Sequence, residues 1–277
     1  MDPVRGARAG GDQAFTCLVP VHGADDAGHF IAAMESIAAA TLAPSEILIC
    51  QDGGLPETLE GAVQTSAGML GARRVRNPGA KGLHHNLNHA MAEVSTPYVA
   101  RADADDINLP GRFAAQVRFV REHPQVAAVG GAIVEFRSDG RSRRKLMPLS
   151  HDDIVRYARW RNPINHMTAF FRTDAFLDCG GYPDIPMKED YALWLTMIGR
   201  GLRLANLDED LVRARLGDSF YDRRSGLSNF SSEYTLYRLK RHIPRMGAAA
   251  AFALLARGGA LAFAGPTRLI YERILRR

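Results

Sequence analysis

Cysteine is scarce in this sequence, because 277 residues contain only Cys17, Cys50 and Cys179, far apart along the chain. That number and spacing exclude the disulfide framework of a small secreted domain and favour a reducing compartment. Residues 1–13 contain no apolar segment, so they predict no secretory signal, and we expect a flexible N-terminal tail there. We therefore expect a cytoplasmic protein.

Motifs of nucleic-acid binding are missing as well. The chain carries a net charge of +5, which suits nucleic acid, an anionic membrane or phosphorylated small molecules as partners. It has, however, no zinc-finger spacing, no RNA-recognition aromatics and no KH loop. We expect no nucleic-acid partner.

A long uninterrupted apolar run is also absent. Residues 247–264 are nearly uncharged, but Arg257 and the pair Gly258–Gly259 interrupt them, and alanine adds little to membrane insertion. The arginines that follow are interspersed with leucine and isoleucine, a pattern typical of an anionic membrane surface. We expect residues 227–277 to form a helical segment that either associates peripherally with a membrane or packs on the rest of the protein.

What the sequence does contain is an alternation of strand-like and helix-like segments. Apolar runs predict strands at 15–21, 46–50, 73–76, 98–102 and 126–136, and helical spacing predicts helices at 26–40, 82–94, 112–123 and 186–201. This alternation is typical of an α/β protein with a parallel, doubly wound sheet and helices on both faces. The polar, basic segment 137–145 indicates a hairpin or loop.

Polar residues follow the predicted strands. Pro20 ends the first strand, Asp52 follows the second, and Asp103, Asp105 and Asp106 follow the fourth. Ligands bind beyond the carboxyl ends of the strands in open parallel sheets, so these residues predict a binding site. The D-A-D spacing points two carboxylates to the same side, where their repulsion favours a hard cation such as Mg²⁺ or Mn²⁺. Alternatively, one or two of these acids cap the helix that follows.

A second acidic pair, Glu189 and Asp190, lies in the first turn of the predicted helix 186–201. Acids in the first turn are stabilised by the helix dipole, so this pair can have a structural role. A catalytic role is the other interpretation, and the residues alone leave both open.

Five segments, in their order and spacing, resemble glycosyltransferase family 2 over about residues 15–226: FTCLVPV, EILICQDGG, the block around DADD, RNPINHMTAFFR and GGYPDIPMKEDYALWL. The resemblance implies the GT-A fold, an α/β fold with a Rossmann-like, mostly parallel sheet and flanking helices. It implies a catalytic domain over residues 14–226, followed by the helical extension 227–277.

The segment LVRARLGDSFYDRRSG (211–226) is similar to bacterial exopolysaccharide glycosyltransferases of the amylovoran type. This similarity implies transfer of one sugar, with inversion, from a nucleotide-diphosphate sugar, a UDP-sugar in our interpretation. The implied acceptor is a glycan or a polyprenyl-diphosphate-linked oligosaccharide at the inner face of the plasma membrane. The implied cofactor is a divalent cation, Mn²⁺ or Mg²⁺.

The family also implies roles for residues at matching positions. On the donor side, Pro20 and Asp52 would bind the nucleotide, Asp103 would contact the ribose or the metal, and Asp105 would ligate the metal. Arg223 and Arg224 would bind the diphosphate. On the acceptor side, His166 would contact the acceptor and Asp190 would abstract the proton, with Glu189 beside it. Three positions depart from the family pattern: Gln51 replaces Asp, Gly54 replaces Ser and His22 replaces Tyr. The QxxRW motif of processive synthases is absent, which argues against a polymerising enzyme.

Two other functions stay open. A sugar-phosphate nucleotidyltransferase would have a glycine-rich, basic loop after the first strand, where this sequence has the acidic PVHGADDAG. A non-catalytic nucleotide-sugar binding module would not need the acid at Asp190.

Overall fold

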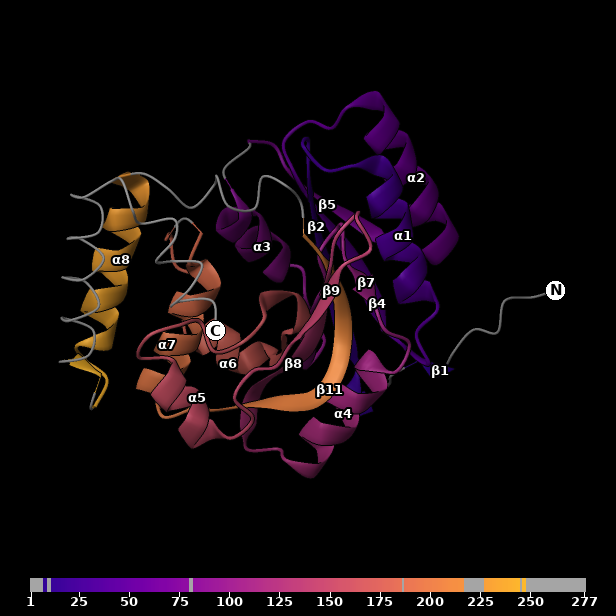
Figure 1. Ribbon diagram of the computed structural model, residues 1–277. Helices are drawn as coiled ribbons and strands as arrows, with labels where there is room; N and C mark the ends of the chain where they lie inside the picture. Colours follow the sequence, from indigo (N-terminus) through magenta and orange to yellow (C-terminus); the bar gives the residue numbers. More distant parts are fainter. Residues whose placement is uncertain are drawn as a thin grey trace.

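The computed structural model describes residues 7–8, 11–79, 82–185, 187–216, 227–244 and 246–247. Its main element is a nine-stranded sheet in the order β5-β4-β2-β6-β10-β8-β11-β7, with β9 paired to β8 (Figure 1). The strands are β2 (Phe15–His22), β4 (Glu46–Asp52), β5 (Arg73–Asn77), β6 (Tyr98–Arg101), β7 (Ile107–Asn108), β8 (Val126–Phe136), β9 (Ser142–Lys145), β10 (Phe170–Arg172) and β11 (Arg203–Arg215). Two short segments, β1 (Ala7–Arg8) and β3 (Leu42–Ala43), pair separately.

The sheet is mostly parallel. Strands β5, β4, β2 and β6 run the same way, and β8 and β11 continue in that direction, because β10 lies antiparallel between β6 and β8. The parallel sheet expected from the sequence is therefore present, with β10, β7 and β9 as antiparallel members. The polar segment 137–145 forms the β8–β9 hairpin, as expected.

Helices cover both faces of the sheet, as the alternating pattern predicts. On one face α1 (Ala27–Ala38), α2 (Glu57–Leu70) and α4 (Arg112–Glu122) bury an apolar core. On the other face lie α3 (Leu83–Met91), α5 (His151–Tyr157), α6 (Thr173–Asp178) and α7 (Glu189–Gly199). The 3₁₀ turns are η1 (Gly11–Gln13) and η2 (His166–Thr168).

Successive side chains of a strand point to opposite faces, and β2 shows how the sequence fills both cores. Phe15, Cys17 and Val19 contribute to the core under α1, whereas Leu18 contributes to the core under α7. Cys17 and Cys50 are buried free thiols, in agreement with the expected absence of disulfides.

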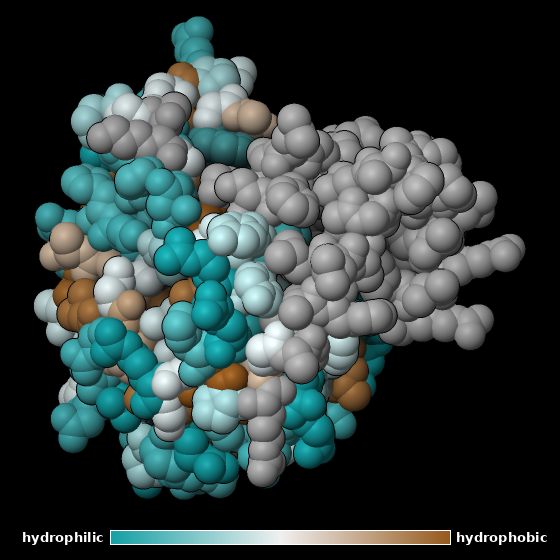
Figure 2. Space-filling view, turned by 90° about the vertical axis from the view of Figure 1, so that its left-hand side faces the viewer, coloured by the Kyte–Doolittle hydropathy of each residue, from teal (hydrophilic) through white to brown (hydrophobic). Residues whose placement is uncertain are grey.

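The helix α8 (Leu227–Lys240) packs against α7 at the edge of the molecule (Figure 1). Lys240 donates a 3.1 Å hydrogen bond to the carbonyl of Arg159, and its ammonium lies 4.6 Å from the ring centre of Tyr191. On the face turned toward the viewer in Figure 2, hydrophilic residues cover most of the described surface and apolar ones form small groups. None of the described helices has the length and apolar composition of a membrane span. Residues 248–277, which include most of the apolar and basic positions that follow α8, lie outside the described residues.

Candidate active site

Three carboxylates come together directly beyond β6. Asp103, Asp105 and Asp106 occupy the turn between β6 and β7, and one oxygen of each lies within 4.8 Å of the others. The backbone N–H of Arg215, at the end of β11, donates a 2.7 Å hydrogen bond to Oδ1 of Asp106. None of the three acids caps a helix, because α4 begins at Arg112 after Gly111, without a side-chain cap. The alternative interpretation as a helix start is therefore wrong.

The electrostatics of this cluster favour a bound cation. Burial and the neighbouring charges of Asp103 and Asp25 raise the pKa of Asp105 above its usual value. Burial and the two other carboxylates raise the pKa of Asp106 further, and its Oδ2 has no hydrogen-bond partner among the described residues. A divalent ion would remove this repulsion and satisfy the orphaned oxygen. The all-oxygen donor set fits Mg²⁺ or Mn²⁺.

Arg101, the last residue of β6, is a buried cation at the cluster, and Nε of Arg215 also donates a 3.3 Å hydrogen bond to the carbonyl of Asp105. The guanidinium of Arg101 contacts the carboxylate of Asp103, and Arg101 is only 5% exposed. Its charge lowers the pKa of Asp105 and Asp106 and also that of the second acidic pair, Glu189 and Asp190, although burial outweighs it in every case. The charge of Arg101 therefore acts on both carboxylate groups, although it contacts only Asp103 directly.

The second acidic pair lies in the first turn of α7, and both residues are buried. Asn162 Nδ2 donates a 2.6 Å hydrogen bond to Oδ2 of Asp190, and the N–H of Tyr191 donates a 2.7 Å bond to Oδ1. Burial raises the pKa of Asp190, and these two donors oppose that effect. Burial and the charge of Asp190 raise the pKa of Glu189 to about 7. The two acids thus differ in their surroundings, because two hydrogen-bond donors favour the ionised form of Asp190.

His166 lies beside the same pair. Its Nδ1 is 4.0 Å from Oδ2 of Asp190, and its Nε2 lies 2.9 Å from the hydroxyl oxygen of Tyr182. Burial and the charge of Arg101 hold the pKa of His166 well below its usual value, so the ring is neutral near pH 7. The structure therefore brings His166 and Asp190 together from segments that are distant in sequence.

The residues predicted to hold the nucleotide lie at the ends of the adjacent strands β2 and β4. Asp52 is buried and accepts hydrogen bonds from Nδ2 of Asn77 at 3.3 Å and from the N–H of Gly82 at 3.0 Å. Pro20 is buried in β2, two residues beyond Leu18, where pairing with β6 ends. A proline is tolerated there because the strand has no further partner on that side.

The three family departures lie around these residues. Gln51 donates to the carbonyl of Gly53 at 2.7 Å and also accepts from Arg74, so its amide belongs to a local network. His22 forms a 2.9 Å ion pair with Asp25, whose hydrogen bond raises the pKa of His22. The carbonyl oxygen of Gly54 lies close to Gly23. A Cβ at position 23 would be 2.9 Å from this oxygen, so only glycine fits at position 23.

The loop between β2 and α1 has no phosphate-binding character. Asp26 caps α1 by accepting a 2.8 Å hydrogen bond from the N–H of His29, and Asp25 is bound to His22. Two carboxylates at this helix start would repel a triphosphate, which argues against the nucleotidyltransferase alternative.

Sequence reasoning missed part of this site. It counted Asp106 among the acids but did not assign it as a ligand, although its position in DADD offered that signal. No sequence motif marks Arg101 or Asn162 as a site residue. Their contacts with Asp103 and Asp190 form only when β6, the turn at 162 and α7 come together in the fold. Arg223 and Arg224 lie outside the described residues.

Comparison with known sequences identifies relatives of one kind. The family model "Glycosyl transferase family 2" matches residues 16–181. The chain is 35% identical over 233 residues to the amylovoran biosynthesis glycosyltransferase AmsE of Erwinia amylovora, covering 84% of this chain and 88% of that protein. It is 28% identical over 230 residues to UDP-Gal:alpha-D-GlcNAc-diphosphoundecaprenol beta-1,3-galactosyltransferase of Escherichia coli, covering 81% and 83% of the two chains.

Comparison with solved structures agrees on the fold. S. aureus TarS 1–349, determined in complex with UDP-GlcNAc, superimposes with a TM-score of 0.67 at 14% identity and covers 94% of this chain and 76% of that one. The expected GT-A architecture, a mostly parallel α/β sheet with flanking helices, is thereby confirmed.

Proposed function

Because the chain belongs to glycosyl transferase family 2, we propose that it transfers a single sugar, with inversion and with a divalent cation, from a UDP-sugar to an acceptor hydroxyl. The acceptor we propose is a glycan or a polyprenyl-diphosphate-linked oligosaccharide used in cell-surface or exopolysaccharide synthesis. The names of the Erwinia and Escherichia relatives support this class of acceptor, and the Escherichia name and the UDP-GlcNAc bound to TarS support the donor class.

The donor side of the proposed reaction uses the ends of β2, β4 and β6. Asp52 would accept an N–H of the base next to Pro20, while Asp103 would contact the ribose or the metal shell. Asp105 and Asp106 would hold Mn²⁺ or Mg²⁺, which supplies positive charge to the departing diphosphate. Arg223 and Arg224 are proposed as further donors to the diphosphate, by resemblance alone.

The acceptor side uses the start of α7. Asp190 would take the proton of the acceptor hydroxyl as that oxygen attacks the anomeric carbon. Its two hydrogen-bond donors, Asn162 and the N–H of Tyr191, fix the carboxylate in one orientation and favour its ionised form. Glu189 and His166 complete the surroundings of the base, and His166 is proposed to contact the acceptor. A base without a covalent nucleophile predicts a single displacement and hence inversion.

One observation carries this proposal: buried Arg101 contacts Asp103 of the oxygen cluster, and its charge also acts on the base candidate Asp190, whose pKa it lowers. Glycosyl transfer needs a site for the metal and the leaving group and, near it, a proton acceptor. Binding of the donor alone would need the first but not the second, so the arrangement favours an enzyme over a binding module.

The proposed domain division follows the same logic. Residues 14–226 form the catalytic unit in this proposal, and the segment 227–277 associates peripherally with an anionic membrane. The basic residues at its end support this location, which would place a cytoplasmic enzyme at its lipid-linked acceptor.

A transfer assay tests the proposal. Purified full-length protein, Mn²⁺ and a panel of UDP-sugars are incubated with a polyprenyl-diphosphate-linked sugar, and mass spectrometry and NMR identify the product and its anomeric configuration. The proposal expects one added sugar of inverted configuration and free UDP. Release of pyrophosphate from UTP and a sugar phosphate would instead identify a nucleotidyltransferase, and a retained configuration would contradict the single displacement.

A further inference from the structure

A loop that precedes the acidic pair is fixed along α3. Asn88 Nδ2 donates to the carbonyl of Tyr182 at 2.8 Å, and the N–H of Tyr182 donates to Oδ1 of Asn88 at 2.9 Å. Gly181 has a φ of +79°, and a Cβ there would lie 2.6 Å from Oδ1 of Asn88, so the close approach requires glycine. The reciprocal bonds therefore hold residues 181–185 against this helix.

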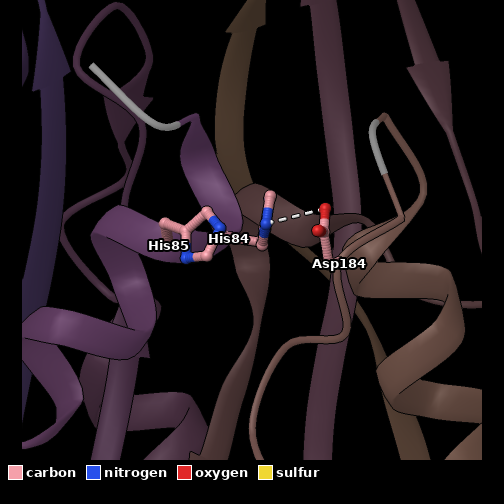
Figure 3. Close-up of side chains that lie close together, drawn as sticks. All are labelled: His84, His85 and Asp184. Carbon is pink, nitrogen blue, oxygen red and sulfur yellow. Dashed lines mark ion pairs between the residues drawn. The ribbon is translucent and has the colours of Figure 1, made fainter. Parts of the chain in front are cut away.

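One helical turn before Asn88, three metal-binding side chains meet across the same boundary. His84 and His85 come from the start of α3 and Asp184 from the loop, and one ligand atom of each lies within 4.8 Å of the others. Figure 3 shows His84 directed at Asp184, with His85 beside it. The two imidazole rings have their centroids 4.2 Å apart.

The contact between His84 and Asp184 is incomplete as it stands. Nε2 of His84 lies 3.0 Å from Oδ1 of Asp184, yet it makes no hydrogen bond of good geometry, and the residue is only 8% exposed. A buried ring nitrogen without a hydrogen bond is costly, and a cation bound by this nitrogen and the carboxylate oxygen would satisfy both atoms.

We propose that His84, His85 and Asp184 bind a zinc-class divalent ion, with one position open to water. Two imidazoles and one carboxylate are a donor set typical of Zn²⁺. Bonds of about 2.0–2.1 Å at tetrahedral angles place neighbouring ligand atoms about 3.3 Å apart, close to the observed separation of Nε2 and Oδ1.

This site differs from the carboxylate cluster in chemistry and in consequence. The cluster offers only oxygen and suits Mg²⁺ or Mn²⁺, whereas imidazole nitrogen favours Zn²⁺ and Co²⁺. An ion held by His84, His85 and Asp184 would connect α3 to the loop that leads into Glu189. It would therefore stabilise the fold at the boundary between the donor and acceptor sides, independently of catalysis.

Cobalt titration of the untagged, chelator-treated full chain tests the site, because Co²⁺ held by few ligands absorbs visible light strongly. We expect one equivalent to form the strongly absorbing complex, separate from any Co²⁺ held by the carboxylate cluster. This complex should form with at least tenfold weaker affinity in His85→Ala and in Asp184→Asn, two exposed positions whose replacement leaves the core intact. His89→Ala, at an exposed histidine on the same helix, and Asp105→Ala should form the absorbing complex as the wild type does. Equal binding in His85→Ala and Asp184→Asn, or no absorbing complex at millimolar Co²⁺, would overturn the proposal. Loss of glycosyl transfer would not bear on this result, because the readout is metal binding.

Discussion

Asn162 donates a 2.6 Å hydrogen bond from Nδ2 to Oδ2 of Asp190, across 28 residues of sequence. This bond and the one from the N–H of Tyr191 favour the ionised form of a carboxylate that burial would otherwise protonate. Burial, together with the negative charge of Asp190, raises the pKa of Glu189 to about 7. Of the two adjacent acids, Asp190 is therefore the one suited to accept a proton, because two hydrogen-bond donors favour its ionised form.

The Asp190→Asn variant should lose turnover and keep donor binding. An amide has nearly the shape of the carboxylate but cannot accept the proton, so we expect the turnover number to fall about 10³-fold. Transfer rates and calorimetric donor affinity measure the two effects. Asp152→Asn, in the first turn of α5, is the matched control. Transfer by Asp190→Asn at close to the wild-type rate would exclude this residue as the base.

The Asn162→Ala variant should shift the pH dependence of transfer. Without its donor, the pKa of Asp190 rises, so the base becomes protonated at a higher pH. We expect the acidic limb of the profile of kcat/KM against pH to move to higher pH, while the rate at alkaline pH changes less. An unchanged acidic limb would show that the bond does not control ionisation of the base.

The Glu189→Gln variant should alter how stability depends on pH. The folded protein holds the proton of Glu189 up to about pH 7, against 4.5 for the unfolded group, so its contribution to stability is lost as the pH rises through 7. Between about pH 5.5 and about pH 8, the free energy of unfolding of the wild type should fall by about 2 kcal/mol more than that of the variant. Urea denaturation at both pH values measures the difference, and parallel behaviour of the two proteins would contradict the raised pKa.

Substitution of the adjacent glycines Gly180 and Gly181 distinguishes the cost of backbone strain from the cost of a steric clash. Both have positive φ, +82° and +79°, but only at Gly181 would a Cβ meet another atom closely, Oδ1 of Asn88 at 2.6 Å. We expect Gly180→Ala to lower the free energy of unfolding by about 1 kcal/mol, and Gly181→Ala to lower it by about 1 kcal/mol or more beyond that. Chemical denaturation of both variants gives the comparison. Equal losses would mean that the Asn88 contacts to the loop add no stability.

The sequence predicted the first half of the fold well, because periodicity is strong there. The runs around Leu18 and Leu48 alternate between the two cores, and the helix with Phe30 and Met34 shows a clear apolar face. Strand β10 has only three residues, and β11 is interrupted by exposed polar positions and register shifts. Neither carries a periodic signal, so both were missed, as was α2.

The sequence predicted those site residues that lie together in a short motif. It missed those that come together only when distant segments pack in the folded protein. The DADD motif indicates three acids at the end of a strand, and in the structure these acids lie close together. The proximity of Arg101 to both acidic groups arises because β6 runs directly into the turn while α7 approaches from a distant segment. No local pattern encodes such a meeting, and the same holds for the bond between Asn162 and Asp190.

Metal-dependent donor binding is the measurement that tests the central proposal most directly. A thermal-shift panel of UDP-sugars and GDP-sugars, with and without Mn²⁺, is run on the wild type, on Asp105→Ala and on Asp139→Asn, an exposed acid of the β8–β9 hairpin. A donor at about a hundredfold its dissociation constant should stabilise the protein by about 2.7 kcal/mol. The proposal predicts a Mn²⁺-dependent shift for one UDP-sugar in the wild type and in Asp139→Asn, and none in Asp105→Ala. The same shift without Mn²⁺, or an equal shift in Asp105→Ala, would contradict it.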